Sequence, residues 1–216
     1  MAAGKDPISI LCFGDSLTWG FDPIDRSRYS HDIRWTRLMQ ADLGPEYYVI
    51  EDGLNSRTTV YEDPIMGDKN GLAHLATALK VHMPIDLLII MLGTNNLKSR
   101  FGLSAEEIAM SLTQHLELAT KSDCGPDYGA PKVLLMSPPP LGPMAGMPFE
   151  AQFSDKSVRE SHRLAEHYKL KADEFGVAFF DTGTKVSASP IDAIHLDDEP
   201  QAGLATAVAA EVRKLV

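Results

Sequence analysis

The stretch ISILCFGDSLTWG, residues 8–20, begins with six residues dominated by large apolar side chains and changes to small and polar ones at Gly14. An apolar run without polar alternation predicts a strand that is buried on both faces of a sheet. Four further runs share this character, at residues 47–50, 87–92, 133–136 and 177–180. The sequence therefore predicts five strands of a central, mostly parallel sheet.

Helical patterns separate these runs. Residues 33–43, 105–121, 157–175 and 201–216 carry apolar side chains at helical spacing, Ser104 and Glu107 form a capping-box pattern, and Gly176 is a typical helix stop. Strands that alternate with helices predict right-handed βαβ units and a three-layer α/β/α sandwich. No repeat or linker divides the 216 residues, so we expect a single domain over residues 1–216.

Composition excludes several classes of function. The net charge of −10, from 20 basic and 30 acidic residues, disfavours nucleic acid and anionic lipid as partners. No apolar stretch approaches the length of a membrane span, and the N-terminus lacks the charged start and cleavage site of an export signal. Cys12 and Cys124 are too few for a disulfide framework, and two buried thiols are the simpler interpretation. We therefore expect a cytoplasmic protein.

Two stretches fit neither a helix nor a strand, residues 22–30 and the proline-rich residues 137–153. Long loops within a compact domain often form the wall of a functional site. The sequence is equally consistent with a rigid connection on the surface.

The strongest local signal for chemistry is Gly14-Asp15-Ser16, where the first strand ends. Ligands of open α/β sheets gather outside the carboxyl ends of the strands, and Gly14 allows a sharp turn and a close approach of substrate. Taken alone, Asp15 and Ser16 are more simply explained as caps of the next helix.

A second signal is Asp192-Ala193-Ile194-His195, just before the final helical pattern. A serine nucleophile needs a base for its proton and a third group that orients this base, and Asp192 and His195 can supply both from one loop. The alternative is a surface aspartate and a solvated histidine.

Two further motifs follow strands. The amide of Asn95, in Gly93-Thr94-Asn95-Asn96, can donate a hydrogen bond to an oxyanion, and residues 52–58 can add a backbone N–H. Each motif alone is typical of a turn. Because all of these motifs are expected at one edge of the sheet, their combination favours catalysis over four separate turns or caps.

Together these motifs resemble the SGNH hydrolases, also called GDSL-type esterases and lipases, over essentially the whole chain. The sequences LCFGDSLTWG (residues 11–20), GLNSRTT (53–59), IMLGTN (90–95) and SPPP (137–140) are similar to the bacterial arylesterase and acyltransferase branch. The resemblance implies a flavodoxin-like fold and a triad of Ser16 as nucleophile, His195 as base and Asp192 as its partner. It also implies a small acyl ester as substrate, acyl transfer to alcohols in some members, and a homo-oligomer.

The resemblance further implies an oxyanion hole made by the Ser16 N–H, the Asn95 side chain and one N–H from residues 52–58. The family usually has glycine at this last position, where Ser56 aligns here, and Gly53 is the alternative donor. The family also usually has aspartate after the oxyanion asparagine, where this chain has Asn96.

Several aromatic side chains are candidates for a substrate pocket: Trp19, Phe21, Trp35, Phe149 and Phe153. Trp19 and Phe153 are the predicted wall residues, and Trp35 is expected in the core. No histidine, cysteine or carboxylate spacing is typical of a metal site, and no glycine-rich nucleotide motif occurs, so we expect no metal and no cofactor.

The sequence thus predicts a serine esterase for short acetyl or aryl esters. A carbohydrate O-acetyl esterase or a thioesterase with the same triad is the first alternative. A non-enzymatic alternative is a flavodoxin-like module that binds an anion at the helix N-terminus after Gly14, but it leaves Asp192 and His195 unexplained.

Overall fold

The central sheet of the computed structural model contains five strands in the order β2-β1-β3-β4-β5, and every neighbouring pair is parallel. The structure describes residues 6–216, so the N-terminal residues examined for an export signal lie largely outside the described part. The strands are β1 (Ile8–Gly14), β2 (Tyr47–Gly53), β3 (Leu87–Met91), β4 (Lys132–Ser137) and β5 (Ala178–Asp181). The predicted runs are therefore strands, and the sheet is parallel throughout.

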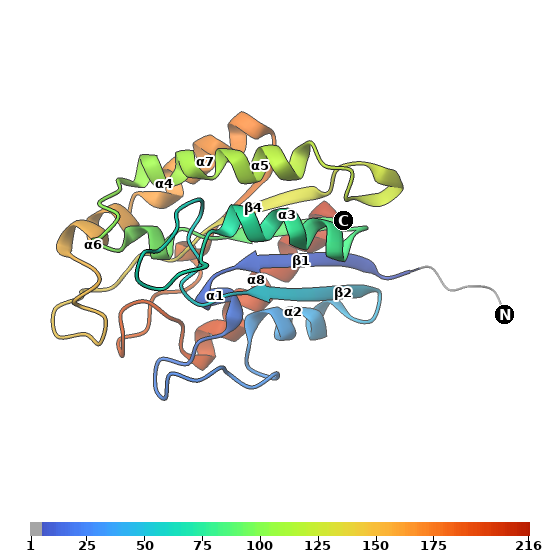
Figure 1. Ribbon diagram of the computed structural model, residues 1–216. Helices are drawn as coiled ribbons and strands as arrows, with labels where there is room; N and C mark the ends of the chain where they lie inside the picture. The colour runs from blue at the N-terminus through green and yellow to red at the C-terminus, as the bar shows by residue number, and fades with distance from the viewer. Residues whose placement is uncertain (1–5) are drawn as a thin grey trace.

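Helices cover both faces of the sheet (Figure 1). One face carries α3 (Gly71–His82), α4 (Ala105–Ser111), α5 (Thr113–Thr120) and α7 (Leu164–Phe175), and the opposite face carries α2 (Trp35–Leu43) and α8 (Asp198–Leu215). The shorter elements are α1 (Ser16–Trp19), α6 (Asp155–Ser161) and the 3₁₀ turns η1 (Thr94–Leu97), η2 (Pro126–Tyr128) and η3 (Thr182–Thr184). This arrangement is the predicted three-layer α/β/α sandwich.

Successive strand residues supply two separate cores. Leu11 and Phe13 of β1 face the core under α3, α5 and α7, whereas Ile10 and Cys12 face the core under α2 and α8. Because side chains alternate between the faces of a strand, a strand covered on both sides needs apolar residues at every position. This requirement explains the unbroken apolar runs in the sequence.

Helices α2 and α8 are joined by a hydrogen bond as well as by apolar packing. Trp35 is fully buried, as expected, and its backbone N–H donates to Oε1 of Gln201 in α8 at 3.0 Å. Its indole Nε1 donates to the carbonyl of Leu17 in α1 at 3.0 Å. The C-terminal helix is thereby tied to the segment that follows β1.

Two helices that the sequence predicts as continuous are interrupted. The pattern over residues 105–121 divides at Leu112, and the pattern over residues 157–175 divides at His162 and Arg163. Each break follows a serine whose hydroxyl donates to the carbonyl three residues earlier, Ser111 to Ile108 and Ser161 to Val158, both at 2.6 Å. A serine that bonds back to its own helix bends it.

A helix that the sequence analysis did not predict is α3. Asn70 caps its start, because its Oδ1 accepts from the N–H groups of Leu72 and Ala73. Its buried residues, among them Leu75 and Leu79, complete the core beside β1 and β3.

Candidate active site

Ser16 lies at the carboxyl edge of the sheet, at the first residue of α1. Asp15 caps this short helix, and its Oδ1 accepts from the N–H of Leu17 at 3.0 Å. A Cβ on Gly14 would lie 2.0 Å from Oγ1 of Thr18 and 2.8 Å from the carbonyl of Met91. The turn from β1 into α1 is thus too tight for any side chain at position 14. Asp15 therefore does cap the helix, while the hydroxyl of Ser16 remains directed at the cavity.

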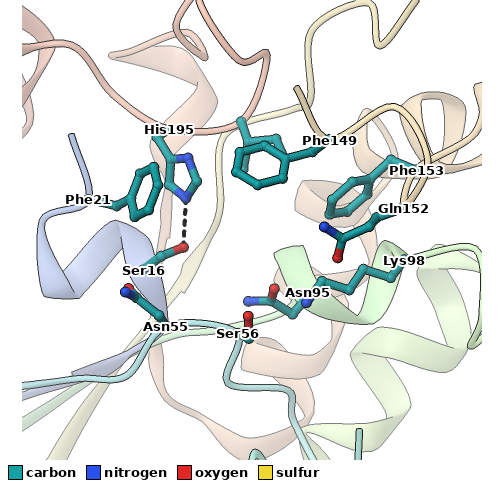
Figure 2. A pocket seen from close by; sticks show the side chains of 11 residues that line it. Ser16, Phe21, Asn55, Ser56, Asn95, Lys98, Phe149, Gln152, Phe153 and His195 are labelled. Carbon is teal, nitrogen blue, oxygen red and sulfur yellow. Dashed lines mark hydrogen bonds between the residues drawn. The ribbon is translucent and has the colours of Figure 1, made fainter. Parts of the chain in front are cut away.

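Ser16, His195 and Asp192 form one hydrogen-bonded line. Nε2 of His195 lies 2.9 Å from Oγ of Ser16, and Nδ1 lies 2.5 Å from Oδ2 of Asp192. Figure 2 shows the imidazole of His195 pointing at the hydroxyl of Ser16 on one side of the cavity. All three side chains are shielded from solvent, with exposed fractions of 6%, 6% and 1% for Ser16, His195 and Asp192. The arrangement has the geometry of a nucleophile, its base and the group that orients the base.

The Asp192 carboxylate is held in its charged form. Its Oδ1 accepts from the backbone N–H groups of Ile194 and His195, each at 2.9 Å. Burial would raise the pKa of Asp192, but the hydrogen bond and charge of His195, together with these two N–H groups, hold it below its ordinary value. A carboxylate bonded to Nδ1–H leaves Nε2 free to accept the serine proton.

Two aromatic rings pack against the base. Phe21 stacks on the imidazole of His195 with a centroid distance of 4.1 Å and an interplanar angle of 28°. Phe149 meets the same imidazole edge-on at 6.0 Å and 70°. The orientation of His195 is therefore fixed from two sides, by packing as well as by Asp192.

Three hydrogen-bond donors lie on the Ser16 side of the cavity. Asn95 follows Gly93, whose φ of +123° turns the chain sharply after β3, and its Nδ2 donates to the carbonyl of Arg57 at 3.1 Å and to Oδ2 of Asp15 at 3.3 Å. Ser56 lines the cavity in the left-handed conformation, with φ of +67°. Within residues 6–216, the backbone N–H groups of Ser16 and Ser56 donate to no other group.

The structure distinguishes the two candidates from residues 52–58. Gly53 pairs with Gly14 in the sheet, and its Cα faces the backbone of Trp19, since a Cβ would lie 2.2 Å from that residue's nitrogen. Gly53 is therefore packed beneath α1 and does not line the cavity, whereas Ser56 does. The positive φ of Ser56 also explains why a glycine is usual at this position.

Asn96, which stands where the family usually has aspartate, ties the turn that carries Asn95 to Thr59. Its Oδ1 accepts from the N–H of Thr59 at 3.0 Å, and its Nδ2 donates to Oγ1 of Thr59 at 2.8 Å. An amide satisfies both groups of Thr59 at once, so the asparagine is compatible with an ordered turn beside Asn95.

The cavity at this site measures about 440 Å³ including its open mouth. Its apolar wall consists of Phe21, Phe149, Phe153 and Ile194, and the polar residues are Ser16, Asn55, Ser56, Asn95, Lys98, Gln152 and His195. The proline-rich loop over residues 137–153 thus forms a wall of the site, one of the two interpretations left open by the sequence.

The prediction that Trp19 lines the cavity is wrong. The chain reverses at Gly20, whose φ is +85°, and this reversal places Phe21 against His195. The Trp19 ring instead lies under the guanidinium of Arg28, 5.3 Å from its centroid. Phe153, the other predicted wall residue, does line the cavity.

Lys98 is a cavity residue that the sequence analysis missed. Its side chain is 4% exposed, and Nζ lies 3.8 Å from Oδ2 of the buried Asp63. Burial and the neighbouring charge of Arg100 lower the pKa of Lys98 to about 8. The sequence does contain a feature from which Lys98 could have been predicted. It lies three residues after Asn95, and side chains at this spacing in a 3₁₀ turn lie on the same side.

Asp15 is a second buried charge at the site. Burial raises the pKa of Asp15 to about 6, although the N–H of Leu17 and the charges of His195, Arg57 and Lys98 act in the opposite direction. The group is therefore mostly ionised at neutral pH and accepts the longer of the two Asn95 hydrogen bonds.

Other classes of site are not supported by the described residues. Over residues 6–216, no group of three or more histidine, cysteine or carboxylate side chains has the arrangement of a metal centre. Cys12 and Cys124 are buried free thiols. None of the helices in the same range has the length and apolar character that a bilayer crossing requires.

Comparison with known proteins identifies similar chains. Residues 12–202 match the GDSL-like Lipase/Acylhydrolase family. An acetylxylan esterase from Xylanibacter ruminicola is 24% identical over 224 residues, which cover 98% of this chain but 44% of that protein. The chain thus spans less than half the length of this curated relative.

Solved structures match over nearly the whole of both chains. A carbohydrate acetylesterase from Sinorhizobium meliloti is 42% identical, with a TM-score of 0.91, and the match covers 96% of this chain and 99% of that one. The inhibitor-bound form of an aryl esterase from M. smegmatis is 39% identical, with the same TM-score and the same coverage. The fold is therefore shared with esterases of known structure.

Proposed function

The chain belongs to the GDSL-like lipase/acylhydrolase family of carboxylic ester hydrolases, and on this premise we propose that it is a serine esterase for short acyl esters. The observation that carries the proposal is the line from Ser16 Oγ through His195 to Asp192, with distances of 2.9 and 2.5 Å. The anion-binding module weighed from the sequence accounts for Ser16 alone and leaves this line without a purpose.

In the first half of the reaction, Nε2 of His195 takes the proton of Ser16 as Oγ attacks the acyl carbonyl carbon. The new C–O bond converts the carbonyl oxygen into an oxyanion, and the imidazolium is stabilised by Asp192. The intermediate then collapses, the bond to the alcohol breaks, and His195 returns the proton to the leaving oxygen. An acyl-enzyme on Ser16 and a free alcohol result.

In the second half, His195 takes a proton from water as the water oxygen attacks the acyl carbon. The bond between this carbon and Oγ of Ser16 then breaks, and His195 returns the proton to Oγ, which releases the acid and restores Ser16. An alcohol can replace water in this step, which yields a new ester. The packing of Phe21 and Phe149 on His195 supports this transfer reaction, because an apolar surface beside the base favours the organic acceptor.

The oxyanion is stabilised by the N–H groups of Ser16 and Ser56 and by Nδ2 of Asn95. The two backbone groups have no other acceptor within residues 6–216. The Asn95 amide has a 3.3 Å hydrogen bond to Asp15, which is long enough for an oxyanion at Ser16 to compete for the same hydrogen. Such donors favour the transition state because they are already oriented when the charge develops.

The substrate is proposed to be an acetyl or other short acyl ester. The phenylalanine wall beside Ser16 is suited to a small acyl group or an aryl alcohol. A carbohydrate acetyl ester is the second candidate, favoured by the 42% identity to a carbohydrate acetylesterase. The same triad would serve a thioester, but no feature of the cavity selects sulfur.

The proposal is tested by replacing Ser16 with alanine and following p-nitrophenyl acetate hydrolysis. We expect loss of turnover and of labelling by a fluorophosphonate, because the nucleophilic oxygen is gone. Ser187→Ala, which removes an exposed loop hydroxyl, is the matched control. Ser16→Ala with turnover like the unaltered enzyme would contradict the proposal.

A comparison of substrates then separates the two candidates. p-Nitrophenyl esters of increasing acyl length define the size of the acyl pocket, and an acetylated xylan oligosaccharide tests the carbohydrate ester. A higher kcat/KM for the sugar than for phenyl acetate would favour the second candidate.

A homo-oligomer and a cytoplasmic location remain predictions. The free thiols of Cys12 and Cys124 support a reducing compartment. Light scattering on the eluting peak of a size-exclusion column measures the number of subunits, and a mass of 23.6 kDa at micromolar concentration would contradict the oligomer.

A further inference from the structure

Lys98 is a buried cation whose hydrogen-bond donors have no acceptor among the described residues 6–216. Within residues 6–216, its ammonium makes no hydrogen bond, and the nearest carboxylate oxygen, on Asp63, is 3.8 Å away. That distance is beyond hydrogen-bond range for an N–H donor. Burial of an ammonium is costly unless its donors are satisfied, so the cavity that Lys98 lines is where an acceptor is required.

Asp63 attracts Lys98 as a charge but does not accept a hydrogen bond from it at 3.8 Å, and other donors already occupy most of the acceptor sites of this carboxylate. Oδ2 of Asp63 accepts from Arg100 at 2.7 Å, and Oδ1 accepts from the N–H groups of Ile65 and Met66 at 3.0 and 3.2 Å. The carboxylate thus has its own cation in Arg100. Lys98 is a second positive charge beside it, directed toward the substrate cavity.

Gln152 adds a second free donor on the same wall. Its backbone is fixed, because its carbonyl accepts from Ser99 and its N–H donates to Phe149, both at 2.8 Å. Its side-chain amide has no hydrogen bond to another described residue and faces the cavity beside Lys98 (Figure 2). A cation and an amide donor next to each other match the two oxygens of a carboxylate.

We propose that Lys98, assisted by Gln152, binds a carboxylate on the ester substrate. The inference rests on the proposed esterase function and narrows its substrate class to esters with one anionic group. The protein has a net charge of −10, so its overall electrostatic field repels anions. A preference for anionic over neutral esters would therefore not arise from the overall charge. Selection for a carboxylate must therefore come from a local cation, and Lys98 is the cation that lines the cavity.

The carboxylate can belong to the acyl group or to the alcohol, and two pairs of esters distinguish these sources. Monomethyl succinate and its neutral methyl ketone analogue, methyl 4-oxopentanoate, test the acyl side. 4-Acetoxybenzoate and 4-acetoxyacetophenone test the alcohol side. For each pair, the ratio of kcat/KM for the anionic to the neutral ester is measured in the unaltered enzyme and in Lys98→Met.

A comparison of ratios removes the other effects of the substitution, because a general loss of activity lowers both members of a pair. We expect the ratio of one pair to fall about tenfold in Lys98→Met, the scale of one lost charge-assisted hydrogen bond. Lys121→Met, which removes an exposed lysine just after α5, controls for the change in net charge. Ratios within about twofold of the unaltered enzyme for both pairs would overturn the proposal.

A second measurement needs no variant. The carboxylate 4-hydroxybenzoate and the neutral 4-hydroxyacetophenone are compared as ligands by calorimetry, and so are succinate and 4-oxopentanamide. Tighter binding of one carboxylate by about tenfold supports the role of Lys98, and equal or weaker binding of both overturns it. Failure of the proposed function has a different signature, because no ester, neutral or anionic, is then hydrolysed.

Discussion

Replacing His115 by leucine should stabilise the protein at pH 4 by much more than it does at pH 7. His115 lies in α5 and is fully buried, and neither ring nitrogen has a hydrogen-bond partner in the described residues. Burial lowers the pKa of His115 to about 4 from an ordinary value of 6.5. Between these values the unfolded chain binds a proton that the folded chain does not. The folded state therefore loses stability as the pH falls through this window.

The size of the effect follows from the two pKa values. At pH 4, the proton bound by the unfolded histidine costs the folded state about 3 kcal/mol, and at pH 7 it costs almost nothing. The leucine side chain has no proton to bind. The stability difference between His115→Leu and the unaltered protein should therefore grow by about 3 kcal/mol from pH 7 to pH 4.

Asp15 has the opposite effect in the same window, which hides the contribution of His115 in the unaltered protein. The pKa of Asp15 is raised from 3.8 to about 6, so the folded chain binds a proton more tightly and gains about 2 kcal/mol as the pH falls from 7 to 4. Asp192 and Glu51, whose pKa values are lowered, begin to lose their contributions only as the pH approaches their ordinary values of 3.8 and 4.5, at the acidic end of this window. His115→Leu should therefore become more stable on mild acidification.

The assay is urea unfolding followed by far-UV circular dichroism at half-unit steps from pH 7.5 to pH 4. The difference between variant and unaltered protein cancels every group that the substitution does not touch. His31→Leu makes the same exchange at an exposed loop position and controls for the change of residue type. Parallel stability curves, with a difference constant within about 1 kcal/mol, would refute a buried neutral histidine.

Three further substitutions test the site and the fold. Asn95→Ala should lower kcat by about 10²–10³-fold with little change in KM, because the amide acts on the oxyanion. Steady-state kinetics with phenyl acetate measure this effect. An unchanged kcat would show that Asn95 is not part of the oxyanion hole. Asp192→Asn should lower kcat about 10⁴-fold, because asparagine favours the wrong tautomer of His195. A decrease in kcat of less than tenfold would mean that Asp192 has a structural role only. Ser104→Ala should cost about 1 kcal/mol in urea unfolding, because the capping box of α4 loses its hydroxyl; full stability would show that Glu107 alone caps the helix.

The layers of the fold could be predicted because they depend on patterns that are local in sequence. A strand covered on both faces must be apolar at each position, and β3, with the sequence LLIIM, is fully buried. The helix breaks could not be predicted in this way. They depend on Ser111 and Ser161, whose hydroxyls also contact Thr59 and Leu141 in distant segments. The start of α3 likewise rests on the cap supplied by Asn70 after an irregular loop.

The positions of the polar site residues could be predicted from the sequence, whereas the aromatic residues of the cavity wall could not. Ser16, Asn95 and His195 lie beside strand ends or the last helix, and the order of strands in a parallel sheet brings such positions together. Which aromatic ring faces the cavity depends on single dihedral angles. Because the chain reverses at Gly20, the ring of Phe21 lies against His195 in the cavity, and the ring of Trp19 lies outside it. Lys98 was missed because a lysine is ordinarily solvated, and only the packing around Asp63 and Arg100 shows that this one is buried.

The separation of Ser16 and His195 has a consequence for synthesis of the protein. The two residues are 179 positions apart, and α8, which joins α2 through Gln201 and Trp35, follows His195 in the chain. At about 5–20 residues per second, the serine is made roughly 10 to 35 seconds before its proton acceptor. During that interval the nascent polypeptide holds an inert hydroxyl, so reactivity toward cellular acyl donors begins only when folding is nearly finished.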